Sequence, residues 1–177
     1  MDLLKGAAGV VITMAIGGTI YTVNQADVVD NFAEDTGLTQ QEATEYVESV
    51  DNSELVSYTE IGDQFVTDGN DLLNAASEID CVNYVYEWES ASLNCIQGQA
   101  QLNKFGNDEI ALGRAFIKLD GPEASRVDIG NTVSLIDTVN EGFQLDIIKA
   151  ILSASTIDES KKTNSYNKAL LEAALEN

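Results

Sequence analysis

Apolar and charged residues are distributed very unevenly at the start of the chain. Residues 6–26 contain no charged side chain, and only Asn24 and Gln25 near the end of this run are strongly polar. A helix of about 20 mainly apolar residues is long enough to cross the hydrocarbon core of a bilayer. The pattern therefore predicts an N-terminal hydrophobic anchor helix, residues 1–26, followed by an acidic helical domain, residues 27–177.

The uncharged run allows three placements: a transmembrane helix, a cleaved secretory signal, or a helix buried in a protein core or filament. Small residues let helices approach one another closely, so we predict helix-packing positions at Gly6, Gly9, Gly17 and Gly18. We expect the run to contact a lipid bilayer or sister subunits. Lys5 precedes the run and acids follow it, which by the positive-inside rule places the domain on the extracytoplasmic or virion-exterior side of a membrane.

After residue 26 the apolar residues recur at helical spacing. Such spacing predicts a helix over 27–35, with Gly37 as its C-cap. Thr39 and Glu42 have the spacing of a capping box, in which each side chain accepts from the other residue's backbone N–H. The apolar residues that follow lie on one helical face, and we expect a helix over 40–50.

The middle of the chain is less regular. We expect a helix around residues 55–65 with Ser53 as its N-cap, then a turn at 68–71, then another helix from Leu72. Between residues 82 and 88 the apolar residues alternate, as is typical of a strand. This stretch therefore has two interpretations, a helix or a small β-hairpin at 82–95.

The remaining apolar stripes predict a mainly helical C-terminal part. The expected elements are a helix from Asn107 or Asp108 to Leu119, a stop at 120–122, two helices within 127–156 divided at Gly142, a polar linker at 153–164 and a short helix at 166–175. The predicted fold class is all-α, with the small hairpin at 82–95 as the one open alternative.

Charge narrows the classes of partner. Thirty acids face nine bases and no histidine, which gives a net charge of -21, and Lys5 is the only base in the first 103 residues. Nucleic-acid binding depends on Lys and Arg side chains that neutralise phosphates, so we expect no nucleic-acid partner. The acidity has two interpretations: solubility in a salty environment, or a surface for cations and basic partners.

Residues 32–50, FAEDTGLTQQEATEYVESV, resemble the opening helix pair of HU-type DNA-binding proteins and also helix-turn-helix segments. The segment has none of the bases that would contact DNA, and the resemblance ends at Val50. We therefore interpret the segment as a helix–turn–helix packing unit and carry no function across.

The only two cysteines, Cys81 and Cys95, form a disulfide or remain two buried thiols. A straight helix would separate their Cα atoms by roughly 21 Å, and a disulfide needs them within about 7 Å. A bridge therefore requires the chain to reverse between them, and we expect the reversal at residues 89–92. An upstream membrane anchor favours the disulfide.

No chemistry-bearing motif accompanies these elements. Without histidine, no serine or cysteine has the usual activating base. The acids around Asp68 fail the calcium-loop pattern, because Leu73 occupies the position that requires glycine. We expect no catalytic residues, cofactor or metal.

The favoured function is a non-enzymatic structural or interaction subunit of a multi-subunit, membrane-associated or viral assembly. The alternatives are a pilin-like filament subunit and a membrane-anchored extracytoplasmic sensor or enzyme.

Overall fold

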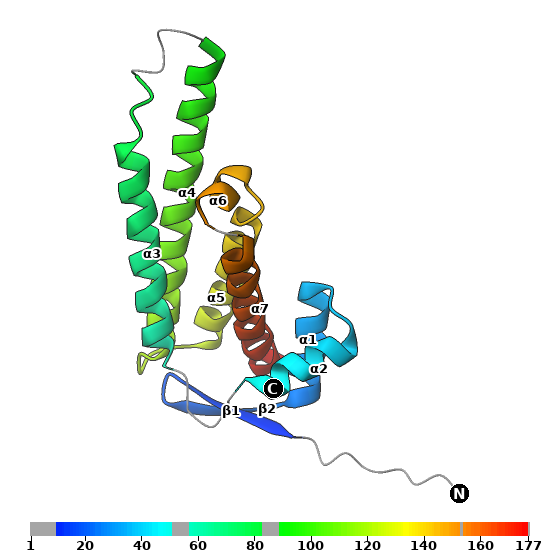
Figure 1. The fold of residues 1–177 in the computed structure, drawn as a ribbon. Helices are drawn as coiled ribbons and strands as arrows, with labels where there is room; N and C mark the ends of the chain where they lie inside the picture. The colour runs from blue at the N-terminus through cyan, green and yellow to red at the C-terminus, as the bar shows by residue number, and fades with distance from the viewer. Residues whose placement is uncertain (1–9, 51–56, 83–88, 153, 177) are drawn as a thin grey trace, which may run out of the picture.

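A computed structural model of the chain describes residues 10–50, 57–82, 89–152 and 154–176 (Figure 1). The elements are β1 (Val11–Ile16), β2 (Thr19–Asn24), α1 (Gln25–Thr36), α2 (Gln40–Ser49), α3 (Tyr58–Glu78), α4 (Glu89–Leu119), α5 (Arg126–Gly142), α6 (Asp146–Ile151) and α7 (Ala154–Glu176). The molecule is mostly helical, as predicted, with one two-stranded antiparallel hairpin at its N-terminal end.

The prediction of an N-terminal hydrophobic helix is wrong for the described residues 10–24, which form a β-hairpin, and a helix begins only at Gln25. β1 and β2 pair in register from Val11 with Asn24 to Ile16 with Thr19. Gly17 and Gly18 form the two-residue turn with φ values of 57° and 75°. Positive φ at both central residues is the geometry that hairpin turns favour, and glycine adopts it without steric cost.

Gly17 and Gly18 are therefore turn residues and not helix-packing residues, while Gly6 and Gly9 lie outside the described residues. Among the described helices, none combines the length and apolar character needed to cross a bilayer. The run is apolar because one face of the hairpin is buried: Ile12, Met14 and Ile16 join the same core as the helices. This correction applies equally to the anchor and to the filament-core helix.

The hairpin turn is attached to the end of the longest helix. The Gly17 N–H donates to the Leu119 carbonyl oxygen over 2.8 Å. A Cβ at Gly17 would lie 2.6 Å from the carbonyl oxygen of Ala124. This close backbone approach, together with the positive φ, explains why glycine is required there.

The helix pair α1 and α2 confirms the local sequence signals. Gly37 ends α1 with a left-handed φ of 72°. Thr39 caps α2, its hydroxyl accepting from the Glu42 N–H while the Glu42 carboxylate accepts from the Thr39 N–H over 2.9 Å. Phe32 stacks on Tyr46 with ring centroids 4.8 Å apart, and Phe32 also meets Tyr166 edge-on. These rings join α1, α2 and α7.

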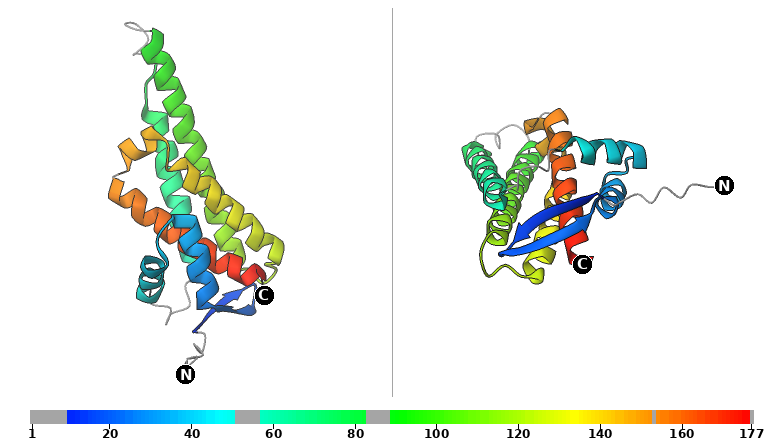
Figure 2. Two further views of the ribbon diagram at one scale, coloured as in Figure 1. Left: turned by 90° about the vertical axis from the view of Figure 1, so that its right-hand side faces the viewer. Right: turned by 90° about the horizontal axis from the view of Figure 1, so that it is seen from below.

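Helices α3 and α4 form a long antiparallel pair whose tip projects beyond the other helices (Figures 1 and 2). Glycines face each other across it: a Cβ on Gly62 would lie 2.4 Å from the Gly113 oxygen, and one on Gly69 would lie 2.5 Å from the Gly106 oxygen. The glycines on each helix are seven residues apart, which places them on one face. The backbones therefore pack closer than any side chain allows.

Three sequence predictions fail in this pair. Residues 68–71, predicted as a turn, lie within α3, because Gly69 serves helix packing. The N-cap of α3 is Ser57, whereas the predicted cap, Ser53, lies outside the described residues. The helix expected from Asn107 or Asp108 is continuous from Glu89, although it ends at Leu119 as predicted.

Cys81 and Cys95 lie at the far end of this pair, with Sγ atoms 2.09 Å and Cα atoms 5.6 Å apart. The predicted disulfide is confirmed in its geometry. The predicted reversal at 89–92 is wrong, since α4 already begins at Glu89, and so is the hairpin alternative from residue 89 onward. Residues 83–88 lie outside the described residues.

The C-terminal part confirms a break after Gly142, where α5 ends, and α6 follows from Asp146. The linker predicted at 153–164 is wrong from residue 154 onward. One continuous helix, α7, covers Ala154–Glu176 and includes the short helix predicted at 166–175. The first half of α7 is mostly polar because much of it lines a groove, while Ile157 joins the core.

The helices form an open arrangement. Helix α4 packs on α3 and α5, and α5 in turn packs on α7, which packs on α1. Helices α4 and α5 thus lie between α3 and α7 in this row, and behind them in the view of Figure 1. A cavity lies between α3 and α7.

Candidate functional site

A groove of about 1070 Å³ lies between α3 and α7. Helix α3 lines it with residues at helical spacing from Glu60 to Ala75, about 22 Å of helix at 1.5 Å per residue. Helix α7 lines it from Ser155 to Asn167, about 18 Å of helix. The groove therefore has the length of a helix of three to four turns.

The groove combines an apolar wall with acidic groups. Its apolar lining consists of Ile61, Phe65, Leu72, Ala75, Phe143, Ile151 and Leu152. Its acidic lining consists of Glu60, Asp68, Asp71, Glu109 and Glu159. No lysine or arginine is among the described residues that line it, so the charge of the groove is negative without an internal counterion.

Glu109 is the most unusual of these acids. The residue is 4% exposed, and its Oε2 atom has no hydrogen-bond partner among the described residues. Burial, reinforced by the neighbouring charge of Asp68, raises the pKa of Glu109 to about 8. Burial also raises the pKa of Asp68, although a hydrogen bond from Gln64 opposes that rise. A buried acid without a partner has a free-energy cost that a cation in the groove would offset.

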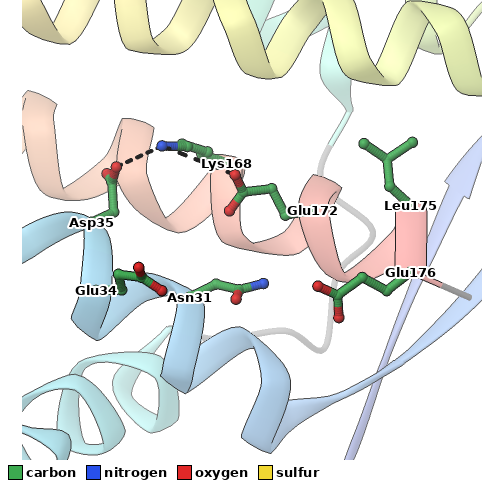
Figure 3. A pocket seen from close by; sticks show the side chains of 7 residues that line it. All are labelled: Asn31, Glu34, Asp35, Lys168, Glu172, Leu175 and Glu176. Carbon is green, nitrogen blue, oxygen red and sulfur yellow. Dashed lines mark hydrogen bonds and ion pairs between the residues drawn. The ribbon is translucent and has the colours of Figure 1, made fainter.

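A second cavity, of about 580 Å³, lies between α1 and the end of α7 (Figure 3). There Lys168 lies 2.7 Å from Asp35, 2.6 Å from Asp137 and 4.0 Å from Glu172. Burial opposes the charge of Lys168, but the hydrogen bonds to Asp137 and Asp35 raise its pKa above its ordinary value. This cluster holds α7 against α1 and α5 through one lysine that three carboxylates share.

The two cavities differ in whether their acidic side chains have a partner within the protein. In the Lys168 cluster each of the three acids has the lysine as a partner, and so the cluster is best explained as a structural ion-pair network. The groove contains an uncompensated buried acid and an apolar wall. We take the groove as the candidate functional site.

The choice of the groove as the candidate site rests on its geometry, because comparisons with known proteins add no support. No family model, no curated protein and no solved structure matches the chain.

The chemistry available in the groove is limited to carboxyl groups, amides and hydroxyls. The chain has no histidine, and both cysteines are joined to each other. No group of three or more potential metal ligands occurs among the described residues. When protonated, Glu109 can donate a proton or a hydrogen bond, and when ionised it can pair with a cation.

The sequence alone does not indicate the groove or Glu109 as a site. Glu109 is one of thirty acids, and nothing in its neighbourhood in the sequence distinguishes it. The available signal lay in the glycines at 62, 69, 106 and 113. Their spacing of seven residues predicts a close helix pair, which places Glu109 beside α3. The polar composition of the start of α7 predicts a linker, so the sequence does not indicate the second wall of the groove.

Proposed function

We propose that this protein is a non-enzymatic interaction subunit whose groove binds an amphipathic, positively charged helix of a partner protein. The observation that carries the proposal is Glu109, a buried carboxyl group without a partner in an apolar groove lined by acids. Recognition of an amphipathic helix by an apolar groove is a recurring mode in which the anchors lie at i, i+3, i+4 and i+7.

The length of the groove favours a helix. Its volume of about 1070 Å³ is close to the upper end of the range of about 300 to 1000 Å³ that is typical of small-ligand pockets, but its lining extends along three to four helical turns of α3 and α7. Charge complementarity defines the partner further. In a partner helix with one apolar face, that face would pack on the apolar lining of the groove, and Lys or Arg residues on and beside it would pair with the acidic lining. The net charge of -21 would increase the rate at which such a helix associates.

The same charge argues against a nucleic-acid partner, because it offers repulsion in place of counterion release. The disulfide supports a location in an oxidising compartment, outside the reducing cytoplasm. We propose that the protein acts there as one component of a multi-subunit assembly.

A fluorescence titration with a labelled peptide tests the proposal. The probe is a 15-residue helical peptide with leucines on one face, one central lysine within that face and further lysines on the opposite face. Because Ala75 is an exposed residue that lines the groove, Ala75→Trp should occupy the space and weaken binding at least tenfold. Ala100→Trp, at an exposed α4 position that does not line the groove, is the matched control and should bind normally.

Saturable one-to-one binding that Ala75→Trp weakens and Ala100→Trp preserves would support the proposal. Equal binding to all three proteins, lost on adding salt, would indicate attraction to the acidic surface in general and would contradict it.

A further inference from the structure

The surroundings of Glu109 contain negative charge from several elements and no compensating base. From α3, the acids Glu60, Asp68 and Asp71 line the same groove, and from α7 Glu159 does so. The described parts of α5, α6 and the turns beside them contribute only Phe143, Ile151 and Leu152 to the lining, and none of these is charged.

On α4 itself, the neighbouring acid already has a counterion, because Lys104 Nζ lies 2.6 Å from the Asp108 carboxylate. The next base along α4, Arg114, is exposed and does not line the groove. No base in the described groove lining is therefore available to Glu109, and an empty groove favours its neutral, protonated form.

We propose that the partner helix places one lysine or arginine against Glu109 and that this cation replaces the Glu109 proton. This inference rests on the proposed function and adds the mode of recognition and its regulation by pH. The carboxylic acid loses one proton to solvent, and the resulting carboxylate pairs with the incoming ammonium or guanidinium group. No other bond forms or breaks, and charge is conserved.

Exchange of the Glu109 proton for a cation explains why a carboxyl group with an unfavourable free energy of burial lies in the floor of the groove. A neutral carboxylic acid lets the empty groove remain folded without a buried charge. An apolar helix without a central cation gains only hydrophobic contacts, whereas a helix with the cation also gains an ion pair shielded from water. The groove therefore selects helices by the position of a basic residue as well as by net charge.

The coupling predicts a measurable proton release. With a Glu109 pKa of about 8, roughly 0.9 of the molecules carry the proton at pH 7. Isothermal titration calorimetry with the lysine-centred peptide, in phosphate and in Tris at pH 7, should therefore report release of close to one proton per peptide. At pH 9.5, where Glu109 is already ionised, the release should fall close to zero.

Three controls separate this coupling from general electrostatics. A peptide isomer in which the central lysine changes places with a leucine at one end of the apolar face has the same composition and charge and should bind without proton release. Glu109→Gln should bind the lysine-centred peptide without proton release. Asp63→Asn, which removes an exposed acid of α3 that does not line the groove, should retain the release.

The outcomes distinguish the two proposals. If the lysine-centred peptide does not bind, the proposed function fails and this inference fails with it. If the peptide binds but releases no proton at pH 7, or releases as many at pH 9.5, only the exchange at Glu109 is overturned. The two wild-type measurements decide the matter even if Glu109→Gln does not fold.

Discussion

The Thr39 hydroxyl satisfies one backbone N–H of the first turn of α2, and the Glu42 carboxylate satisfies another. Loss of an N-cap side chain typically costs about 1 kcal/mol, so Thr39→Ala should lower the free energy of unfolding by that amount. Glu48→Ala, at an exposed position of the same helix, is the control and should cost less. Urea unfolding of both variants measures the difference, and equal losses would show that the cap has no special role.

Glu109 makes the stability of the protein depend on pH in an unusual direction. Its pKa is raised from 4.5 to about 8 by burial and by Asp68. The folded state therefore binds the proton more tightly than the unfolded state. The stabilisation is fully present below pH 4.5 and is lost progressively as the pH rises through about 8.

Glu109→Gln should remove this dependence, because glutamine is a neutral isostere of the protonated acid. The wild type should lose stability on the order of 4 kcal/mol between pH 4.5 and 9 relative to this variant. Urea unfolding of both proteins at several pH values between 4 and 9 measures the loss. Parallel stability curves would show that Glu109 does not carry a raised pKa.

At the scale of elements, the α3/α4 pair depends on glycines that leave no space for a Cβ. Gly69→Ala would place a methyl group 2.5 Å from the Gly106 carbonyl oxygen. Overpacking of this kind typically costs 1–3 kcal/mol, and backbone atoms cannot move aside easily. We expect a loss of about 2 kcal/mol in the free energy of unfolding, measured by urea denaturation.

Gly130→Ala provides the matched control, because a Cβ there meets nothing within 4 Å. Gly130 lies inside α5, where alanine is the better helix former. This variant should gain about 0.5–1 kcal/mol. A loss of similar size in both variants would mean that the close approach of α3 to α4 is not the reason for the glycines.

The disulfide fixes the tip of the same helix pair. Closing a loop of this length restricts the unfolded chain by roughly 3 kcal/mol. Reduction should therefore lower the free energy of unfolding by a similar amount. Intact mass after alkylation in denaturant should show no added groups before reduction and two after it, and two groups before reduction would show that the bridge is absent.

The elements that the sequence predicted correctly are those with a local physical signal. The capping box at Thr39, the C-cap at Gly37 and the break at Gly142 all depend on residues close together in the chain. The hairpin was missed although Gly17 and Gly18 carry its turn. Hydropathy summed over residues 6–26 gives the same value for a membrane helix and for an amphipathic hairpin. The alternation of Ile12, Met14 and Ile16 was the signal that distinguishes them.

The groove could not be predicted in the same way, since its walls lie about 90 residues apart in the sequence. It depends on how α4 and α5 separate α3 from α7. Tertiary placement also decides which acid is buried, and Glu109 and the exposed Asp71 look alike in sequence. The sequence therefore predicts the helices and the disulfide but not the site.

At the scale of the whole molecule, the acidic residues that line the groove differ in role from those spread over the surface. A charge of -21 spread over the surface favours solubility. The acids that line the groove do more, because they surround an apolar wall of helical length and leave one buried carboxyl group without a partner. On this account α3, α4, α5 and α7 are a helical bundle with one side open, and the partner helix completes it.

The most direct test of this central claim is to locate the bound peptide by nuclear magnetic resonance. Addition of the lysine-centred peptide to the isotope-labelled protein should shift the backbone amide signals of α3 between Glu60 and Ala75 and of α7 between Ser155 and Asn167. The signals of α2, which carries exposed acids but lies outside the groove, should remain in place. Shifts spread over all acidic surfaces, or concentrated on α2, would contradict the account.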